Sequence, residues 1–239
     1  MKFPLFELDF KTQTGRESLM SGDFFIKKYA DKHECIYEYS ILEKIAKTCS
    51  TNFLVPKAFK IIVGSNDSFI IMERIKGIPL RKYIINYLLY GKNDVPKMFN
   101  NLGKVLRELH YSPLEGLRTC NFPNSCEEIK LEISKLSEKL VTSHILDSEL
   151  KKAILTSIKG ISKMNDEIFT NVNLHGEFYF THIILSKSKY VFLDFHNACN
   201  GPSYFDIAML STSLNVSLTL PLLTLRQLTP LIHAFLNGY

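Results

Sequence analysis

The sequence predicts an α+β fold of two lobes, in which a small N-terminal lobe is built on an antiparallel sheet and a larger C-terminal lobe is mainly helical. Short runs of aromatic and β-branched residues alternate with turns as far as Ile75. Gly77 and Pro79 then interrupt this pattern, and beyond them apolar residues recur at helical spacing. The length of 239 residues suits two lobes, because one domain takes roughly 150 residues. We place the boundary so that one lobe comprises residues 1–76 and the other residues 77–239.

Strands dominate the first lobe. The expected strands are Phe3–Phe10, Phe24–Tyr29, Ala58–Val63 and Ser68–Ile75. The polar segment Lys11–Gly22 carries two glycines and predicts turns around a short strand, Glu17–Met20. One helix is expected at Glu34–Thr48, because its apolar residues recur at helical spacing.

Helices dominate the second lobe. Amphipathic patterns predict them at Leu80–Tyr90, Val95–His110, Glu127–Leu140, Asp147–Met164, Phe205–Leu214 and about Leu220–Leu236. The segment Tyr111–Ser125 is expected to be a loop, since it contains two prolines and a glycine. Two short strands, Ile183–Leu185 and Tyr190–Phe195, flank a Ser-Lys-Ser-Lys turn.

The charge pattern argues against a nucleic-acid partner. The net charge is only +5, the basic residues alternate with acids, and no Lys/Arg run is long enough to form a basic arm.

We expect a cytoplasmic protein without a membrane span. The five cysteines are scattered and form no C-x-x-C pair, which is typical of buried or free thiols in a reducing compartment. Pro4 and two acids interrupt the N-terminal segment before a secretory apolar core could form. The apolar stretch Ile207–Leu225 approaches bilayer length, but its polar residues and Pro221 favour packed helices.

The stretch Leu174–Asp206 gathers most of the groups that could carry chemistry. As zinc ligands, His175, His182 and His196 with two acids fit none of the recurring spacings. The H-x-E half of a zinc deaminase is present, but the P-C-x-x-C half is absent. The chain also lacks G-x-x-x-x-G-K-[ST], G-x-G-x-x-G and G-x-S-x-G, so neither a phosphate cradle of those types nor a hydrolase triad is indicated.

The order of parts along the chain indicates a protein-kinase-like phosphotransferase. A strand lysine comes first, then a helix acid, a linker and a helical region, and finally a His-Gly-acid turn and a strand-terminal acid. Lys27 and Lys28 must face opposite sides of their strand, so only one can point into a site. We choose Lys27.

The motifs resemble those of the aminoglycoside phosphotransferase and choline kinase family. HGEFYFTHII at His175–Ile184 is similar to H-G-D-x-x-x-x-N-[IV]-[IL], and Asp194 followed by GPSYFDIA is similar to the family's later Asp and G-x-P-x-x-D-[IL]-[AG]. LGKVLRELH at Leu102–His110 looks like its helix ending in Leu-His, and IIMERIKGIPL at Ile70–Leu80 like its linker. The resemblance spans about Phe24–Leu214 and implies a protein-kinase-like two-lobe fold.

The resemblance also implies roles for individual residues. Lys27 would hold the nucleotide phosphates and pair with Glu38, and the backbone of Glu73 and Ile75 would bind the adenine edge. The first lobe would therefore bind ATP.

In the second lobe the resemblance implies a catalytic loop and an acceptor site. Glu177 stands where the family has its catalytic Asp, and His182 stands where it has an Asn metal ligand. Asp194 would bind Mg²⁺ or, alternatively, Mn²⁺, which accepts an imidazole ligand more readily. His175 and Asp206 would support the loop structurally.

Glu177 and His182 differ from the Asp and Asn of the family pattern, and two hypotheses of function follow from these differences. The first is an ATP-dependent phosphotransferase that moves the γ-phosphate to a hydroxyl of a small molecule, with Glu177 as the base. The alternative is a pseudokinase of the same fold that acts as a nucleotide-binding or regulatory module, since Glu for Asp adds about 1.5 Å of reach and small misplacements can cost about 100-fold. A third reading is a helical protein with a chance likeness. The acceptor is not indicated.

Overall fold

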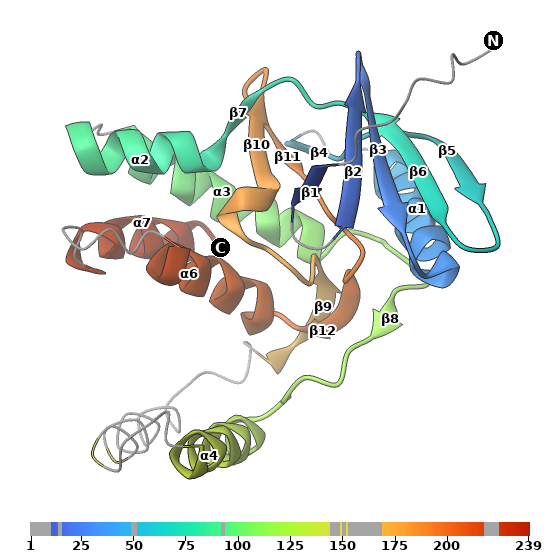
Figure 1. Cartoon of the computed structure of the whole chain (residues 1–239). Coiled ribbons are helices and arrows are strands. Elements are labelled where there is room, and N and C mark those ends of the chain that lie inside the picture. Colours follow the sequence, from blue (N-terminus) through green and yellow to red (C-terminus); the bar gives the residue numbers. More distant parts are fainter. Residues whose placement is uncertain are drawn as a thin grey trace.

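A five-stranded antiparallel sheet opens the chain. The computed structural model describes residues 11–13, 16–48, 52–91, 94–143, 149, 152, 169–217 and 225–239. The sheet order is β1-β2-β3-β6-β5, and the strands are β1 (Lys11–Gln13), β2 (Arg16–Ser21), β3 (Phe24–Tyr29), β5 (Ala58–Val63) and β6 (Ser68–Glu73) (Figure 1). The predicted strand Phe3–Phe10 and almost all of the predicted helix Asp147–Met164 lie outside the described residues.

The long strands of this sheet agree with the sequence patterns, and the predicted short strand Glu17–Met20 lies within β2. Lys11–Gln13 was expected to belong to a turn, but it forms β1, which pairs with β2. The strand expected to reach Ile75 ends at Glu73. Helix α1 (Lys32–Lys47) packs on the sheet through Ile41, Leu42 and Ile45, and the Asp31 side chain caps its first turn.

Two smaller sheets join segments that are distant in sequence. One has the order β4-β11-β10-β7, and the other has the order β8-β12-β9. Their strands are β4 (Phe53–Leu54), β7 (Ile78–Pro79), β8 (Arg118–Thr119), β9 (Asn171–Leu174), β10 (Ile183–Ser186), β11 (Lys189–Phe192) and β12 (Cys199–Pro202). The strands of two residues and the strands β9 and β12 were not predicted, because they are too short to show an alternating pattern. The strand expected to end at Phe195 ends at Phe192.

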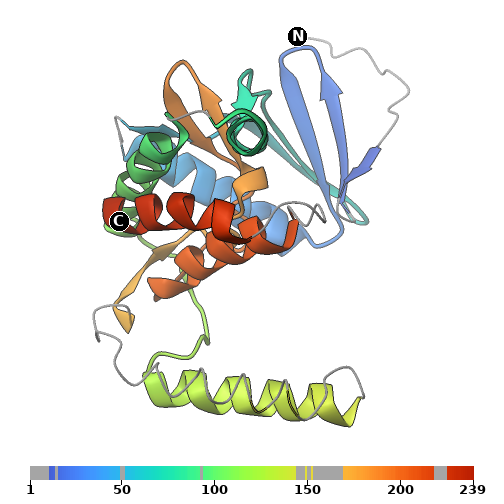
Figure 2. The same ribbon diagram turned by 90° about the vertical axis from the view of Figure 1, so that its left-hand side faces the viewer.

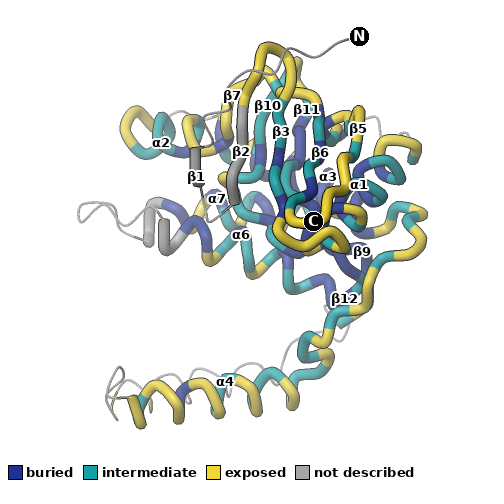
Figure 3. The backbone as a smooth tube through the Cα atoms, turned by 45° about the vertical axis from the view of Figure 1, so that its right-hand side comes forward, coloured by how far each residue is buried: buried dark blue, intermediate teal, exposed yellow. Residues whose placement is uncertain are grey.

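The helices of the second half lie where the apolar stripes predict them. They are α2 (Leu80–Tyr90), α3 (Val95–His110), α4 (Cys126–Thr142), α6 (Tyr204–Ser217) and α7 (Leu225–Gly238). Helix α4 lies apart from the other described elements (Figures 1 and 2), and it is exposed along most of its length (Figure 3), with only Ser137 buried. No helix in the described ranges is long and apolar enough to cross a membrane.

Helices α3 and α7 approach each other closely at two glycines. A side chain at Gly103 would collide with the Phe235 carbonyl oxygen, and one at Gly238 would collide with the Asn100 carbonyl oxygen. Around this contact Phe99, Leu106 and Phe235 are fully buried. The α3–α7 pair therefore forms part of the main core, and His110 at the end of α3 is positioned by it.

We predict that Gly103→Ala destabilises the protein, although alanine favours a helix. Insertion of one methyl group against backbone atoms costs about 1–3 kcal/mol. Urea unfolding of both proteins measures the change, and Lys104→Ala on the exposed side of the same helix is the matched control. An unchanged midpoint for Gly103→Ala would contradict the close approach of the two helices.

Candidate functional site

A loop between β9 and β10 carries the His-Gly-acid motif, and a buried carboxylate holds it in place. Asp206, in the first turn of α6, is 0% exposed. Its Oδ2 accepts the backbone N–H of His175 at 2.7 Å, and its Oδ1 accepts the N–H of Gly176 at 3.0 Å. Gly176 has φ +84°, and a side chain there would collide with the Asn197 carbonyl oxygen. The loop backbone is thus fixed from behind.

The His175 side chain is neutral and completes this support. Its Nε2 lies 2.9 Å from the Leu193 carbonyl oxygen, which can only accept, so Nε2 carries the proton. Its Nδ1 then accepts the Glu177 N–H at 3.3 Å. Burial lowers the pKa of His175 to about 4, and the nearby Asp206 charge opposes that shift only in part.

His110 is a supporting residue that the sequence analysis did not assign. Its Nε2 donates to Asp206 Oδ2 at 3.0 Å, and its Nδ1 accepts from the Tyr239 hydroxyl at 2.6 Å. Burial raises the pKa of Tyr239 to about 12. The motif LGKVLRELH ends in His110, so the sequence contains a signal for this residue, although the resemblance assigns it no role. Asp206 therefore joins α3, α6 and the loop.

Lys27, Glu38 and Asp194 converge on one buried cluster. Lys27 Nζ lies 3.0 and 2.7 Å from the two Glu38 oxygens and 2.6 Å from Asp194 Oδ1. Lys28 faces the opposite side of β3 and pairs with Asp67 at 3.3 Å. The structure thus places Lys27, and not Lys28, beside the acid that follows β11.

Glu38 is fully engaged on the inner side of α1. Besides Lys27, its carboxylate accepts the Tyr29 hydroxyl at 2.5 Å and the Phe195 N–H at 3.2 Å. Burial, together with the Glu38 charge, raises the pKa of Tyr29 far above its usual range. A buried carboxylate with this many donors is anchored, so Glu38 fixes the position of Lys27.

Asp194 occupies a strained backbone position. Its φ of +67° lies in the left-handed region, which costs a non-glycine residue about 1–2 kcal/mol. Burial by itself would raise its pKa, but the hydrogen bond from His196 and the Lys27 charge outweigh burial and hold the pKa well below its usual range. Asp194 is therefore an anion at neutral pH.

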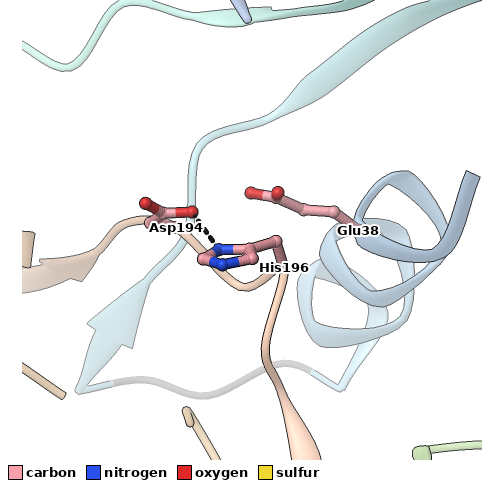
Figure 4. A group of neighbouring side chains, drawn as sticks. All are labelled: Glu38, Asp194 and His196. Atoms are coloured by element: carbon pink, nitrogen blue, oxygen red, sulfur yellow. Dashed lines mark hydrogen bonds and ion pairs between the residues drawn. The ribbon is translucent and has the colours of Figure 1, made fainter. Parts of the chain in front are cut away.

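The sequence predicts no role for His196 beyond a poorly spaced zinc ligand, and the structure places its ring between Asp194 and Glu177. Its Nδ1 donates to Asp194 Oδ1 at 2.6 Å, as Figure 4 shows, and its Nε2 lies 3.5 Å from Glu177 Oε1. The ring is only 4% exposed. Its position two residues after Asp194 carried no periodicity that could reveal this contact.

Glu177 and His182 face the same cluster from the loop. Glu177 Oε1 accepts from the Asn197 amide at 2.8 Å. His182 Nδ1 donates to the Glu177 carbonyl oxygen at 3.0 Å, and its Nε2 lies 4.0 Å from Asp194 Oδ2. One ligand atom from each of Glu177, His182 and Asp194 lies within 4.8 Å of the others. These donors fit a divalent cation, and the imidazole favours Mn²⁺ over Mg²⁺.

The remaining predicted residues, Glu73 and Ile75, lie outside this cluster. They line a cavity of about 570 Å³ together with side chains from β4 and from the turn between β10 and β11. The Glu73 N–H is donated to the Lys57 carbonyl oxygen at 2.9 Å. The Glu73 N–H is therefore already bonded, and only the carbonyl oxygen of Glu73 would remain to bind the edge of an adenine ring.

A cavity of about 340 Å³ opens beside Glu177. It is lined by Cys120, Phe122, Gly176, Glu177, Tyr179, Asn197, Phe205 and Met209. The rings of Phe122 and Phe205 stack with their centroids 3.6 Å apart. A cavity of about 700 Å³ shares Cys120 and Phe122 with it and extends to α4, where Glu128, Glu132 and Lys135 line it.

Cys120 and Cys199 form a disulfide, which corrects the expectation that the cysteines are free thiols. β8 runs parallel to β12, and this pairing brings Cys120 next to Cys199 across a sequence separation of 79. Such a non-local pairing leaves no signal in the cysteine spacing. Cys35 is a buried free thiol, and Cys49 lies outside the described residues.

Residues 21–227 match the sequence profile of the family described as APH: Phosphotransferase enzyme family. No curated protein sequence matches the chain.

Several solved structures share the fold. The aminoglycoside 2'-phosphotransferase-IIIa GDP complex is 15% identical with a TM-score of 0.61, covering 99% of this chain and 86% of that chain. ADP-bound APH(2'')-Ib is 17% identical with a TM-score of 0.55, covering 98% and 83%. APH(3'')-Id from Streptomyces rimosus with ADP and streptomycin is 14% identical with a TM-score of 0.53, covering 96% and 92%. At these identities the likeness establishes the fold, and the predicted fold class is confirmed.

The lowered pKa of His175 predicts a loss of stability in mild acid. The unfolded ring titrates near 6.5 and the folded ring near 4, so the unfolded state binds more protons between these values. The contribution is complete above about pH 6.5 and falls by about 3 kcal/mol as the pH drops to about 4. The contribution of Asp194 is lost only below its usual value of 3.8. Urea unfolding from pH 7.5 to 4 should show a shallower slope for His175→Gln, and equal slopes would exclude this origin.

Reduction of the Cys120–Cys199 disulfide should lower the free energy of unfolding by about 2–4 kcal/mol, because the bond closes a long loop in the unfolded chain. Thermal unfolding with and without a reductant measures the effect. Cys120→Ser should resemble the reduced protein, whereas Cys126→Ser should retain the response to reductant. A response that persists in Cys120→Ser would exclude this bond as its source.

Proposed function

The chain belongs to the phosphotransferase enzyme family, and from that membership we propose that it transfers the γ-phosphate of ATP to a hydroxyl group of a small molecule. The observation that carries this proposal is the convergence of Lys27, Glu38 and Asp194 on one cluster beside the Glu177 loop. The three residues come from a strand, a helix and a loop that are far apart in sequence, and a lysine and an acid in this relation are the parts that phosphoryl transfer requires.

The nucleotide would bind at the first sheet. Lys27, held by Glu38, would contact the phosphates, and the backbone of Glu73 and Ile75 would hold the edge of the base. In this structure the Lys27 ammonium lies 2.6 Å from Asp194, so the positive charge is already oriented toward the site where phosphates would lie. The related structures contain ADP or GDP. We propose ATP as the nucleotide.

Asp194 and His182 would hold the metal ion, Mg²⁺ or Mn²⁺. When bound, the ion neutralises charge on the phosphate oxygens. Asp194 is suited to this role because its carboxylate is anionic and is fixed by two donors, Lys27 and His196. The Nε2 atom of His182 faces the same carboxylate.

Glu177 would act as the base for the acceptor hydroxyl. Its carboxylate lines the 340 Å³ cavity, and Asn197 orients it. An acceptor that stands in this cavity would place its hydroxyl against Glu177, with the Phe122–Phe205 stack as an apolar wall. One of the related structures contains streptomycin. For this chain we propose a small molecule with a hydroxyl group as the acceptor.

The alternative of a nucleotide-binding pseudokinase rests on two side chains. Glu177 is longer than the aspartate that the family has at this position, and His182 replaces an asparagine. The frame around them is intact, because Asp206, His175 and Gly176 keep their hydrogen bonds. The two alternatives therefore differ in the chemistry of Glu177 and His182 and share the same fold.

We further propose a cytoplasmic location, where ATP is supplied. The Cys120–Cys199 disulfide is unusual for that compartment.

ATP turnover measured with Mg²⁺ or Mn²⁺ against a panel of small alcohols and amino sugars tests the activity. Glu177→Gln keeps the size of the side chain but removes the base, so turnover should fall by about 100-fold or more. Lys28→Ala, on the opposite face of the same strand as Lys27, should leave turnover unchanged.

Equal turnover in wild type and Glu177→Gln would remove Glu177 from the mechanism. The double variant Glu177→Asp, His182→Asn restores the residues of the family pattern. If only this variant turns over ATP, the natural chain is a pseudokinase.

A further inference from the structure

We propose that Glu177, His182 and Asp194 form a three-ligand site that binds a divalent transition-metal ion, such as Mn²⁺ or Zn²⁺, in the absence of nucleotide. The inference rests on the proposed catalytic site and deepens it, because it makes Glu177 a metal ligand and specifies which ions bind and when.

The hydrogen bonds of His182 fix the ring in the form that binds a metal. Its Nδ1 lies 3.0 Å from the Glu177 carbonyl oxygen, which can only accept, so Nδ1 carries the proton in the neutral ring. Its Nε2 then presents a lone pair. A bond from the other ring nitrogen to a carbonyl group is the usual way in which proteins orient a histidine ligand.

That lone pair faces a carboxylate oxygen across a gap. His182 Nε2 lies 4.0 Å from Asp194 Oδ2, which is too long for a hydrogen bond. Asp194 Oδ1 is held by Lys27 and His196, each at 2.6 Å, so the carboxylate is fixed with Oδ2 toward His182. A cation placed between these two atoms could be coordinated by both.

Glu177 supplies the third donor. Its Oε1 accepts from Asn197 at 2.8 Å and lies 3.5 Å from His196 Nε2. These two contacts place the Glu177 carboxylate beside His196, which is itself bonded to Asp194.

The spacing of the three donors suits a bound ion after a small contraction. The donor atoms lie within 4.8 Å of one another. Ligand atoms at about 2.0–2.2 Å from one ion are separated from each other by about 3.0–3.5 Å. Displacements of the ligand atoms by about 1–2 Å, through side-chain rotation, would therefore close the site. The side chains of Glu177 and His182 are partly exposed, which leaves room for such movements.

A second group of possible ligands, Glu38, Asp194 and His196, does not form a competing site. Both Glu38 oxygens are already occupied by Lys27, Tyr29 and the Phe195 N–H. His196 directs its protonated Nδ1 to Asp194, as Figure 4 shows. These atoms are donors and acceptors of existing hydrogen bonds, and the metal site is therefore assigned to the loop side of Asp194.

The composition of the site determines which ion binds and when. Mg²⁺ prefers oxygen ligands and usually binds through one or two carboxylates together with substrate phosphates. One imidazole and two carboxylates suit Mn²⁺ or Zn²⁺ better, and three protein ligands can hold such an ion without a phosphate. The remaining coordination positions stay open to water or to phosphate oxygens.

Isothermal titration calorimetry of the metal-free full-length chain with MnCl₂, ZnCl₂ and MgCl₂, without nucleotide, tests the proposal. We expect one Mn²⁺ or Zn²⁺ per chain and at least tenfold weaker Mg²⁺ binding. His182→Asn should weaken Mn²⁺ and Zn²⁺ binding by about tenfold or more. His33→Asn, at an exposed histidine outside the site, should bind as the wild type does.

Pulsed electron paramagnetic resonance of the Mn²⁺-loaded wild-type chain supplies a measurement that needs no variant, because one coordinated imidazole gives a nitrogen coupling. The proposal is overturned if Mn²⁺ and Zn²⁺ do not bind without nucleotide, if His182→Asn binds them as tightly as the wild type, or if no nitrogen coupling is seen.

The outcomes also separate this inference from the proposed function. Phosphotransfer with Mg²⁺ but no binding of Mn²⁺ or Zn²⁺ to the nucleotide-free chain would reject the metal site and keep the phosphotransferase. Binding of one ion with an imidazole ligand and no turnover on any acceptor would keep the metal site and favour the pseudokinase.

Discussion

A buried carboxylate in the first turn of α6 accepts hydrogen bonds from three groups, and the geometry of the site depends on it. Asp206 receives the backbone N–H groups of His175 and Gly176 and the ring of His110. A carboxylate that is fully removed from water is stable only when its oxygens are satisfied in this way. The loop that carries Glu177 and His182 is therefore positioned by the helical core, and the α3–α7 contact at Gly103 forms part of the same support.

A second electrostatic cluster connects the first sheet to this loop. Lys27 lies between Glu38 and Asp194, so one ammonium group links β3, α1 and the segment after β11. The cluster carries two anions and one cation, and His196 contributes a further donor to Asp194. Charge in the site is thus arranged before any ligand is present, which reduces the reorganisation that a charged substrate would require.

The sequence predicted those parts of the fold that depend on long local patterns. The periodicity of Val95–His110 and the aromatic and β-branched content of Phe24–Tyr29 predicted elements with the observed bounds. Short strands such as β9 and β12 are defined by partners elsewhere in the chain and have no pattern of their own. The Cys120–Cys199 bond and the contacts of His196 depend in the same way on chain segments that only the fold brings together.

The Cys120–Cys199 disulfide anchors the segment that forms one wall of the cavity beside Glu177. The wall of the cavity beside Glu177 is formed in part by Phe122, which belongs to a segment attached to the body through the short β8–β12 pairing and the bond at Cys120. Among the described residues, none of those that bind Asp206 or Lys27 comes from the segment between β8 and α4. Mutations in this segment can accumulate without disturbing the contacts of Asp206 and Lys27, so the wall of the cavity can change while both clusters are retained.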